Sequence, residues 1–259
     1  MPLHLNPLSK SPPNPAGESD IYLLPALSAI QLRAWLSTPL YSAIYPGPPS
    51  THPGIVDSSV KRHRRALLSD PTYHFVSLVG CHDPEVGEPW QVVAFVKYAV
   101  LEYADANAVE AGKVKARGEE REWAEGTNVA LANWVWGAVV GVREKYGEEL
   151  GRYVLVDILA TEPGWQRQGA GRMLMQEVCR EADERGWPCL LEGSEEGRRL
   201  YEQMGFVARE EIWVDMGRWE GGKDKGEGWR GEGAREGVGE GWYRMVVMTR
   251  AARAKETGS

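Results

Sequence analysis

The spacing of hydrophobic and polar positions changes along the chain and predicts β-strands in several short segments. Successive side chains of a strand point to opposite faces, so short runs of alternating or continuous apolar residues are typical of strands. Glycine, proline and charged residues bound each run. The predicted strands are residues 20–26, 73–80, 90–100, 153–161, 189–192, 206–216 and 242–249.

In other segments apolar residues recur every three or four positions, which predicts amphipathic helices. We expect Asp57 or Ser58 to cap the second of these helices and Thr127 to cap the third. The helix that begins near Gly171 is expected to end at Gly186. The predicted helices are residues 27–36, 54–69, 128–145, 171–185 and 195–204.

Three segments are too polar, or too rich in glycine and proline, to join a core. Residues 1–18 are rich in Pro, Ser and Asn and predict a disordered N-terminal arm. Residues 217–241 carry glycine at about every third position and predict a flexible insertion inside a hairpin, and residues 251–259 form a polar tail. The strands on either side of each break lack partners of their own, so residues 19–250 are predicted to form a single domain.

Composition narrows the class of protein. The 259 residues are 42% apolar and carry a formal net charge of -7. Nucleic acid is therefore not an expected partner, because binding to phosphates needs clustered basic residues. No stretch approaches the roughly 18 to 20 apolar residues that span a bilayer, so we expect no membrane association and a cytoplasmic protein. The basic run at residues 61–65 leaves a nuclear address open, although a solvated helix face is the favoured interpretation.

Cysteine and histidine are sparse. Cys81, Cys179 and Cys189 are odd in number and form no CxxC pair, which predicts free thiols in a reducing compartment. The five histidines lack the spacing of metal ligands, so we expect no metal site.

The segment that follows the strand at residues 153–161 carries the clearest chemistry. A strand delivers the chain into residues 166–171 (QRQGAG), where a helix begins. The first amides of a helix are unpaired and lie at the positive end of its dipole, so they bind anions. Glycine at 169 and 171 lets the backbone approach a pyrophosphate closely, and Arg167 and Arg172 add charge-assisted contacts.

Two common nucleotide-binding motifs do not fit this segment. A Walker A loop requires Lys-Ser or Lys-Thr after its glycines, and none follows here. A Rossmann fingerprint requires a third glycine where Leu174 stands. Taken alone, the two glycines are also compatible with a tight turn that binds nothing.

Gln166-x-x-Gly169-x-Gly171 resembles the Q/R-x-x-G-x-G/A signature of the GNAT superfamily of N-acetyltransferases. About thirty residues on, residues 200–206 (LYEQMGF) resemble the superfamily's LYE-x-x-GF element. The match covers about residues 153–206, whereas the first hundred residues carry no comparable signature. The sequence VDILATEP is similar to the LDILATHP of fungal-type members, with Glu162 in place of the histidine.

The resemblance implies an α+β fold, with a mixed, mostly antiparallel sheet that contains a splayed strand pair and is flanked by helices. It also implies acetyl-coenzyme A as cosubstrate, without a metal. Leu159, Ala160 and Thr161 would lie along the pantetheine arm. The pyrophosphate would bind the loop and first helical turn, formed by Gln166, Arg167, Gln168, Gly169, Ala170, Gly171, Arg172 and Met173.

Tyr201 matches the superfamily's frequent general acid. A phenol with a pKa near 10 is protonated at neutral pH and can donate its proton to the departing thiolate. The alternative is that Tyr201 only packs against the cofactor or the core.

The general base that accepts the proton of the attacking amine is less well marked. Asp157 lies in the strand expected to line the cleft, and alternation places it on the same face as Leu155 and Leu159. An equal alternative is a buried carboxylate bonded to the 128–145 helix or to a loop. Glu192 is a second candidate and a water relay a third.

These features predict an N-acetyltransferase that acts on a primary amine of a small molecule or peptide. The alternative is a non-catalytic acyl-coenzyme A sensor or interaction module with the same fold. The acidic surface slightly favours a cationic acceptor. Residues 36–54 and the segment after Ala104 should form the acceptor site, and the oligomeric state, monomer or homodimer, stays open.

Ser194 is a candidate helix cap. Four tryptophans could wall a substrate pocket, although core positions are favoured for most of them: Trp134, Trp136, Trp165 and Trp213.

Overall fold

A computed structural model describes residues 2–8, 20–81, 89–103, 122–219, 225–226 and 241–253. Within these ranges no helix is both long and apolar enough to cross a membrane. All three cysteines lie in this part of the chain and are buried free thiols, as expected from their number and spacing.

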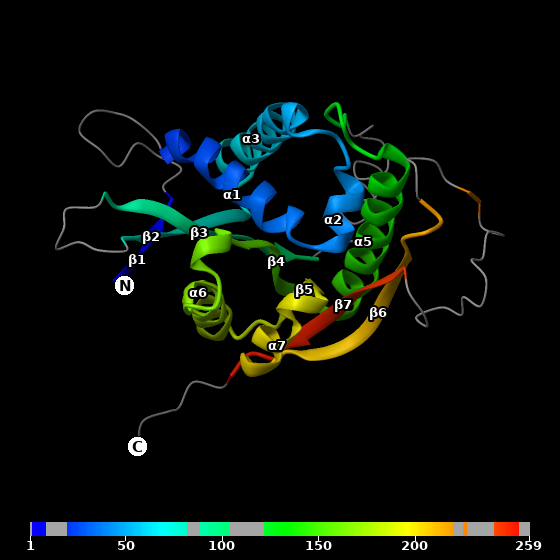
Figure 1. The fold of residues 1–259 in the computed structure, drawn as a ribbon. Helices are drawn as coiled ribbons and strands as arrows, with labels where there is room; N and C mark the ends of the chain where they lie inside the picture. The colour runs from blue at the N-terminus through cyan, green and yellow to red at the C-terminus, as the bar shows by residue number, and fades with distance from the viewer. Residues whose placement is uncertain are drawn as a thin grey trace, which may run out of the picture.

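The centre of the molecule is a seven-stranded sheet with the strand order β1-β2-β3-β4-β5-β7-β6 (Figure 1). Neighbouring strands are antiparallel except for β4 and β5, which are parallel. The predicted mixed, mostly antiparallel sheet is therefore confirmed. The strands are β1 (Leu3–Pro7), β2 (Tyr73–Gly80), β3 (Gln91–Glu102), β4 (Arg152–Thr161), β5 (Cys189–Ser194), β6 (Val207–Asp215) and β7 (Trp242–Arg250).

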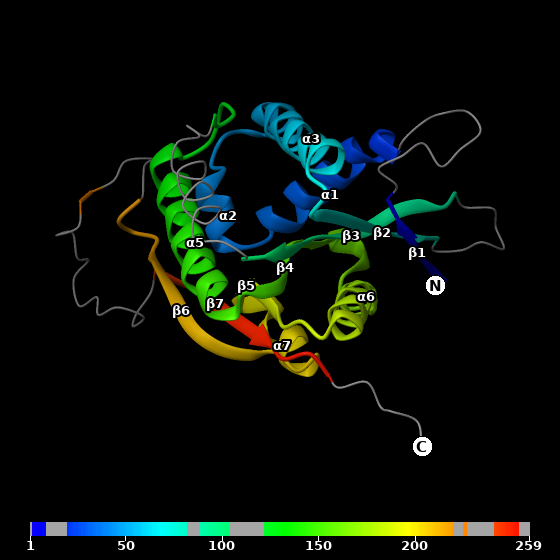
Figure 2. The same ribbon diagram turned by 180° about the vertical axis from the view of Figure 1, so that it is seen from behind.

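Helices cover both faces of the sheet. One face carries α1 (Leu24–Leu36), α2 (Pro39–Ile44), α3 (His52–Ser69) and α5 (Val129–Leu150), and the other carries α6 (Ala170–Arg185) and α7 (Glu195–Gln203), as Figures 1 and 2 show from opposite sides. Short 3-10 helices occur at Asp20–Leu23, Pro49–Thr51 and Pro163–Trp165. Alternate side chains of β4 belong to the apolar cores on the two faces of the sheet. Val154 and Val156 pack on the α6 side, and Leu155 packs on the α5 side.

The parallel strands β4 and β5 separate along their length. They pair only from Val154 opposite Cys189 to Val156 opposite Leu191. Beyond these three rungs β4 continues beside β3, and β5 continues beside β7. The splayed strand pair is therefore confirmed, and it opens from Asp157 and Glu192 onward.

A register shift in β4 marks the same point. Tyr98 of β3 lies opposite Val156, whereas Lys97 lies opposite Ile158, so Asp157 is an extra residue in the strand. Such a bulge interrupts the alternation of side chains between the two faces. Asp157 therefore shares its face with Leu155 but not with Leu159, which packs on the α6 side, so the predicted alternation is wrong beyond the bulge.

The N-terminal part of the chain differs from the prediction in two places. Residues 20–26 form a 3-10 turn and the start of α1 rather than a strand, because Pro25 suits a first helical turn and the buried Leu24, Leu27 and Ile30 follow helical spacing. Leu3–Pro7, inside the expected disordered arm, forms the edge strand β1 against β2. Residues 9–18 lie outside the described ranges.

The residues that begin or cap α3 and α5 also differ from those predicted. Thr51 precedes α3 and Pro53 lies in its first turn, so Asp57 and Ser58 are interior residues and not caps. Asn128, rather than the expected Thr127, caps α5 by accepting a 3.2 Å hydrogen bond from the Leu131 amide. The Asn128 side chain also donates to the Trp219 carbonyl at 3.0 Å, which fixes the first residues of the predicted 217–241 insertion.

His63 is a fully buried polar residue in the α1–α3 layer. It contacts Gln31 through Nε2 at 2.8 Å, its Nδ1 has no hydrogen-bond partner among the described residues, and its ring packs at an edge-to-face angle to Phe75 and Phe95. Burial lowers the pKa of His63 to about 3, and the positive charges of Lys97 and Arg62 act in the same direction. His63 is therefore neutral at physiological pH.

Protonation of His63 should destabilise the protein in mild acid. The unfolded chain binds this proton near pH 6.5 and the folded chain only near pH 3. The contribution of His63 to the free energy of unfolding is therefore fully present above pH 6.5 and is lost as the pH is lowered below that value. The expected loss from His63 between pH 7 and pH 5 is roughly 2 kcal/mol. Denaturant unfolding of wild type and His63→Leu at both pH values measures it. The pH-dependent loss should shrink in the variant and persist in His4→Gln, an exposed control; equal losses in wild type and His63→Leu would contradict the expectation.

Candidate active site

The loop between β4 and α6 has the conformation of an anion site. Gly169, the residue before α6, is left-handed with φ of 91°, and Arg167 also has a positive φ of 62°. The side-chain amide of Gln168 donates to the Gly164 carbonyl at 2.9 Å, and that of Gln166 donates to the Thr161 carbonyl at 3.3 Å. Among the residues that the structure describes, no side chain caps the first turn of α6. The first amides of this helix therefore lie uncapped at the positive end of its dipole.

Gly171 lies where α6 approaches both α7 and β4. A Cβ at this position would stand 3.2 Å from Leu200 of α7 and 3.8 Å from Leu159 of β4. Glycine therefore permits the close approach of three elements beside the opening between β4 and β5.

The edge of β4 that faces this opening carries the three residues expected along the pantetheine arm. Ala160 and Thr161 pair through their other edge with Phe95 and Ala94 of β3, and Leu159 pairs with Val96. Within the described ranges, no strand pairs with the β5-facing edge beyond Val156. Backbone groups there remain available to an extended ligand.

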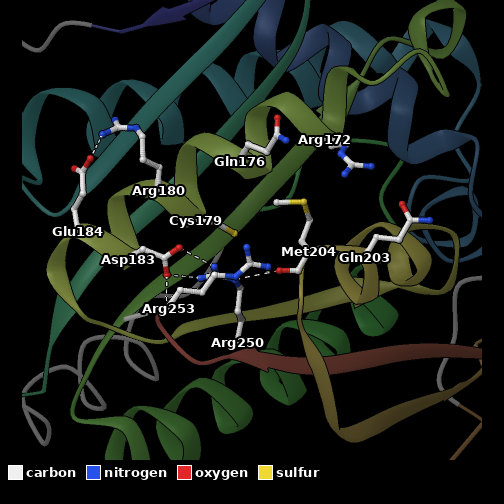
Figure 3. Close-up of a pocket in the computed structure, with 10 residues that line it drawn as sticks. All are labelled: Arg172, Gln176, Cys179, Arg180, Asp183, Glu184, Gln203, Met204, Arg250 and Arg253. Carbon is white, nitrogen blue, oxygen red and sulfur yellow. Dashed lines mark hydrogen bonds and ion pairs between the residues drawn. The ribbon is translucent and has the colours of Figure 1, made fainter. Parts of the chain in front are cut away.

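A groove of about 450 Å³ continues from the loop along α6 (Figure 3). Arg172, which belongs to the first turn of α6, and Arg250, the last residue of β7, both line it. Arg250 donates twice to Asp183 at 2.8 Å, and these bonds raise the pKa of the arginine and lower that of the carboxyl. The lining residues are Arg172, Gln176, Cys179, Arg180, Asp183, Glu184, Gln203, Met204, Arg250 and Arg253.

Tyr201 lies on the α6–α7 face of the sheet, next to the opening. Its side chain packs edge-on against Phe206, and the residue is 8% exposed. Burial raises the pKa of Tyr201 to about 12, so the phenol keeps its proton at neutral pH. This is the protonation state that a general acid requires.

Two glycines make room for the Tyr201 ring. A Cβ at Gly193 of β5 would stand 2.8 Å from the ring, and a Cβ at Gly197 of α7 would stand 2.9 Å from it. Sequence analysis did not single out these glycines, because their requirement arises only from the packing of α7 on β5.

Replacing Gly193 with alanine should displace the Tyr201 ring and lower kcat about tenfold or more, since small displacements of reacting groups are costly. Steady-state turnover and thermal melting of Gly193→Ala measure the effect. Gly141→Ala is the matched control, because a Cβ there meets no atom of the described residues within 4 Å. Wild-type kcat in Gly193→Ala would show that the ring position does not matter.

Asp157 is an ion-paired residue in the structure. Its carboxylate receives Lys97 Nζ at 2.7 Å and Arg143 Nη1 at 2.9 Å. Burial alone would raise the pKa of Asp157, but the charges and hydrogen bonds of Lys97 and Arg143 outweigh it and hold the pKa well below its usual range. A carboxylate stabilised in this way is a weak proton acceptor, and its partner on α5 matches the structural alternative for this residue.

The side chains of Glu192 and Ser194 also accept hydrogen bonds. Glu192 accepts from Arg143 Nη2 at 2.8 Å and from Arg143 Nε at 3.1 Å, and its side chain is only 4% exposed. Ser194 Oγ accepts from the Gly197 amide at 3.2 Å and caps α7, as one interpretation of the sequence proposed.

Glu162, which directly follows β4, forms a surface ion pair. It accepts from Arg33 Nη2 of α1 at 2.6 Å and from Arg33 Nε at 2.8 Å. The pair ties the end of β4 to α1.

Among the tryptophans, Trp165 is a core residue packed against Gly80 of β2, whereas Trp134 packs near Trp219 in the α2–α5 core.

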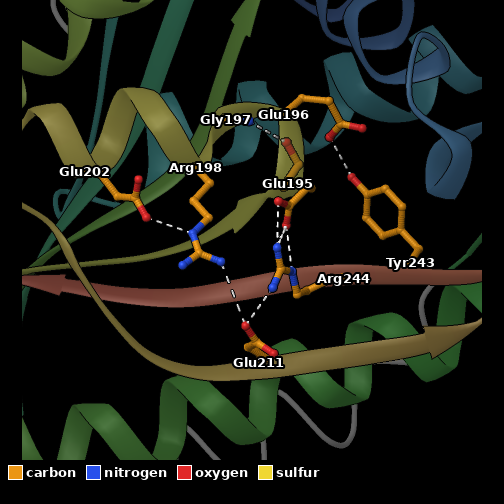
Figure 4. A network of polar contacts seen from close by, with 9 residues as sticks. Glu195, Glu196, Gly197, Arg198, Glu202, Glu211, Tyr243 and Arg244 are labelled. Atoms are coloured by element: carbon orange, nitrogen blue, oxygen red, sulfur yellow. Dashed lines mark hydrogen bonds and ion pairs between the residues drawn. The ribbon is translucent and has the colours of Figure 1, made fainter. Parts of the chain in front are cut away.

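The first turn of α7 carries a polar network that sequence analysis did not find (Figure 4). Glu195 accepts from Arg244 of β7 at 2.6 Å, and Arg244 also donates to Glu211 of β6 at 3.0 Å. The Tyr243 hydroxyl donates to Glu196 at 2.9 Å, and the Glu196 side chain points away from the Arg244 cluster. Glu196 is exposed and lies in the first turn of α7, which directly follows β5.

A family model described as an acetyltransferase (GNAT) domain matches residues 123–208. The matched stretch runs from α5 to the start of β6 and contains the splayed strands, the anion loop and Tyr201. The chain carries a GNAT acetyltransferase domain. The reaction class predicted from the sequence, an acetyl-coenzyme A-dependent acyltransferase, is therefore confirmed.

Solved structures share the GNAT fold over nearly the whole chain. Arylalkylamine N-acetyltransferase 2 from Aedes aegypti superposes with a TM-score of 0.59 at 12% identity, over 97% of this chain and 99% of that chain. A polyamine N-acetyltransferase from Drosophila melanogaster gives 0.53 at 12% identity, over 96% and 100%. An agmatine N-acetyltransferase gives 0.53 at 11% identity, over 96% and 99%. No curated sequence matches.

Within the described ranges, no group of three or more His, Cys, Asp or Glu side chains is arranged to hold a metal ion.

Proposed function

We propose that this protein transfers the acetyl group of acetyl-coenzyme A to a primary amine of a small molecule by direct attack on the thioester. The observation that carries the proposal is the uncapped start of α6 beside the unpaired edge of β4. An anion-binding helix end and a free strand edge together suit a diphosphate joined to an extended amide arm.

The cosubstrate would contact the chain through three regions. Its pantetheine amides would pair with the backbone of Leu159, Ala160 and Thr161. Its pyrophosphate would bind the amides of residues 168–173, with Gln166, Arg167 and Arg172 beside it. The groove along α6 supports a place for the adenosine half, because the cationic side chains of Arg172 and Arg253 line it.

Tyr201 would donate its proton to the sulfur as the carbon–sulfur bond breaks. The ring lies on the α6–α7 face beside Gly193, at the level where β4 and β5 have parted. We assign the proton of the attacking amine to water rather than to Asp157 or Glu192, because both carboxylates are held by Arg143. Transfer then needs only an amine placed within reach of the thioester carbon.

A small, cationic or aromatic amine is the acceptor that we favour. The structural neighbours named above are called arylalkylamine, polyamine and agmatine N-acetyltransferases. On this chain, the exposed Glu196 carboxylate is held by Tyr243, which shares one apolar cluster with the stacked pair Trp35 and Tyr41. A carboxylate next to aromatic rings suits an organic ammonium ion.

Thiol release tests the proposal. The full chain is mixed with acetyl-coenzyme A and a panel of arylalkylamines, polyamines, agmatine and a lysine peptide, and free thiol is followed over time. Amine-dependent release supports the proposal. Saturable cofactor binding without release for any amine would favour the non-catalytic sensor, and no binding at millimolar acetyl-coenzyme A would overturn both readings.

A further inference from the structure

We propose that Arg143 is a positioning residue that sets the opening between β4 and β5 in which the thioester lies. The inference rests on the proposed acetyl transfer. Arg143 lies on α5, on the face of the sheet opposite Tyr201, so it acts through the strands and not through the reacting atoms.

The position of Arg143 coincides with the point where the strands part. The last paired rung joins Val156 to Leu191, and the next residue on each strand is a carboxylate, Asp157 or Glu192. Arg143 bonds to both: Nη1 donates to Asp157 at 2.9 Å, and Nη2 donates to Glu192 at 2.8 Å. A guanidinium thus replaces the missing backbone rung.

Burial makes this bridge stiff. The side chains of Arg143 and Asp157 are 17% and 13% exposed, and Lys97 adds a second cation on Asp157 at 2.7 Å. Two cations and two anions therefore balance. Without Arg143, two largely buried carboxylates on adjacent strands would repel each other, which is strongly unfavourable in an interior.

The helix that carries Arg143 is itself fixed. Val139, Val142 and Tyr146, on neighbouring turns of α5, are buried in the cores against the sheet. The guanidinium therefore ties both strands to a rigid element. Arginine is required because its planar fork spans two carboxylates, whereas a lysine ammonium is a single point of charge.

The expected result is a loss of turnover without an equal loss of cofactor binding. Arg143→Met/Glu192→Gln removes one positive and one negative charge, so the core stays balanced while the bridge is lost. We expect kcat to fall about tenfold or more and the Kd of coenzyme A, measured by calorimetry, to change less than about threefold, since the anion loop is intact. Arg143→Lys, which can contact one carboxylate, should also be slow.

Lys145→Met is the matched control. Lys145 lies two residues further along the same helix and forms an exposed ion pair with Glu210. It should keep wild-type kcat, and all variants are compared at a temperature where melting curves show them folded. A folded Arg143→Met/Glu192→Gln variant with wild-type kcat would overturn the positioning role while leaving the proposed function intact. A wild type without turnover for any amine would overturn the proposed function and this role with it.

Discussion

Replacing Tyr201 with phenylalanine should lower kcat by about 10²-fold while the affinity for acetyl-coenzyme A stays nearly constant. Proton transfer by a positioned acid commonly contributes a factor of this size or more. The ring would keep its packing on Phe206 and its place between Gly193 and Gly197, so the change removes only the hydroxyl. Steady-state thiol release and calorimetric titration with coenzyme A separate the two effects.

Tyr153→Phe is the control for this experiment. Tyr153 is also buried, and burial raises its pKa to about 12, as it does for Tyr201. Its side chain, however, belongs to the α5 side of the sheet. The control should keep wild-type kcat. Full turnover in Tyr201→Phe would mean that the thiolate takes its proton from another source and that Tyr201 only packs.

Replacing Gly171 with leucine should weaken acetyl-coenzyme A binding by about 100-fold. A side chain there would meet Leu200 at 3.2 Å from its first carbon and would cover the helix amides that the pyrophosphate needs. The loss of two charge-assisted hydrogen bonds, each about 1.5 kcal/mol, gives a change of this order. Isothermal titration measures the Kd directly.

Gly137→Leu serves as its control, because in the described part of the chain a Cβ at this exposed position of α5 meets no atom within 4 Å. Binding should be unchanged in the control. If Gly171→Leu binds acetyl-coenzyme A as tightly as the wild type, and is folded, the anion loop is not the cofactor site.

Much of the fold follows from local patterns. The strands β2, β3 and β4 and the helix α6, with its end at Gly186, were predicted because periodicity and turn residues agree in those segments. The edge strand β1 was missed, since LHLNP is short and its strand character comes from pairing with β2. The bulge at Asp157 reverses alternation through a change in pairing with β3, which no pattern within β4 reveals.

The candidate site also contains residues that the sequence predicted and residues that it did not. The loop at residues 166–172 is continuous in sequence, so its glycines and glutamines could be read directly. Arg143 was not found, because VREKYGEE reads as a solvated helical stretch and its partners come from two strands. Arg250 and Arg253 join the groove from the far end of the chain, and only the packing of β7 brings them beside α6.

The most direct test of the central claim is to follow the acetyl group itself. Wild-type protein is mixed with acetyl-coenzyme A labelled in the acetyl group and with the amine that gave the fastest thiol release, and the products are separated. The proposed function predicts one labelled N-acetyl amine formed per thiol released, with formation slowed in Tyr201→Phe. Label that stays on coenzyme A, or appears only as free acetate at the rate seen without amine, would contradict it.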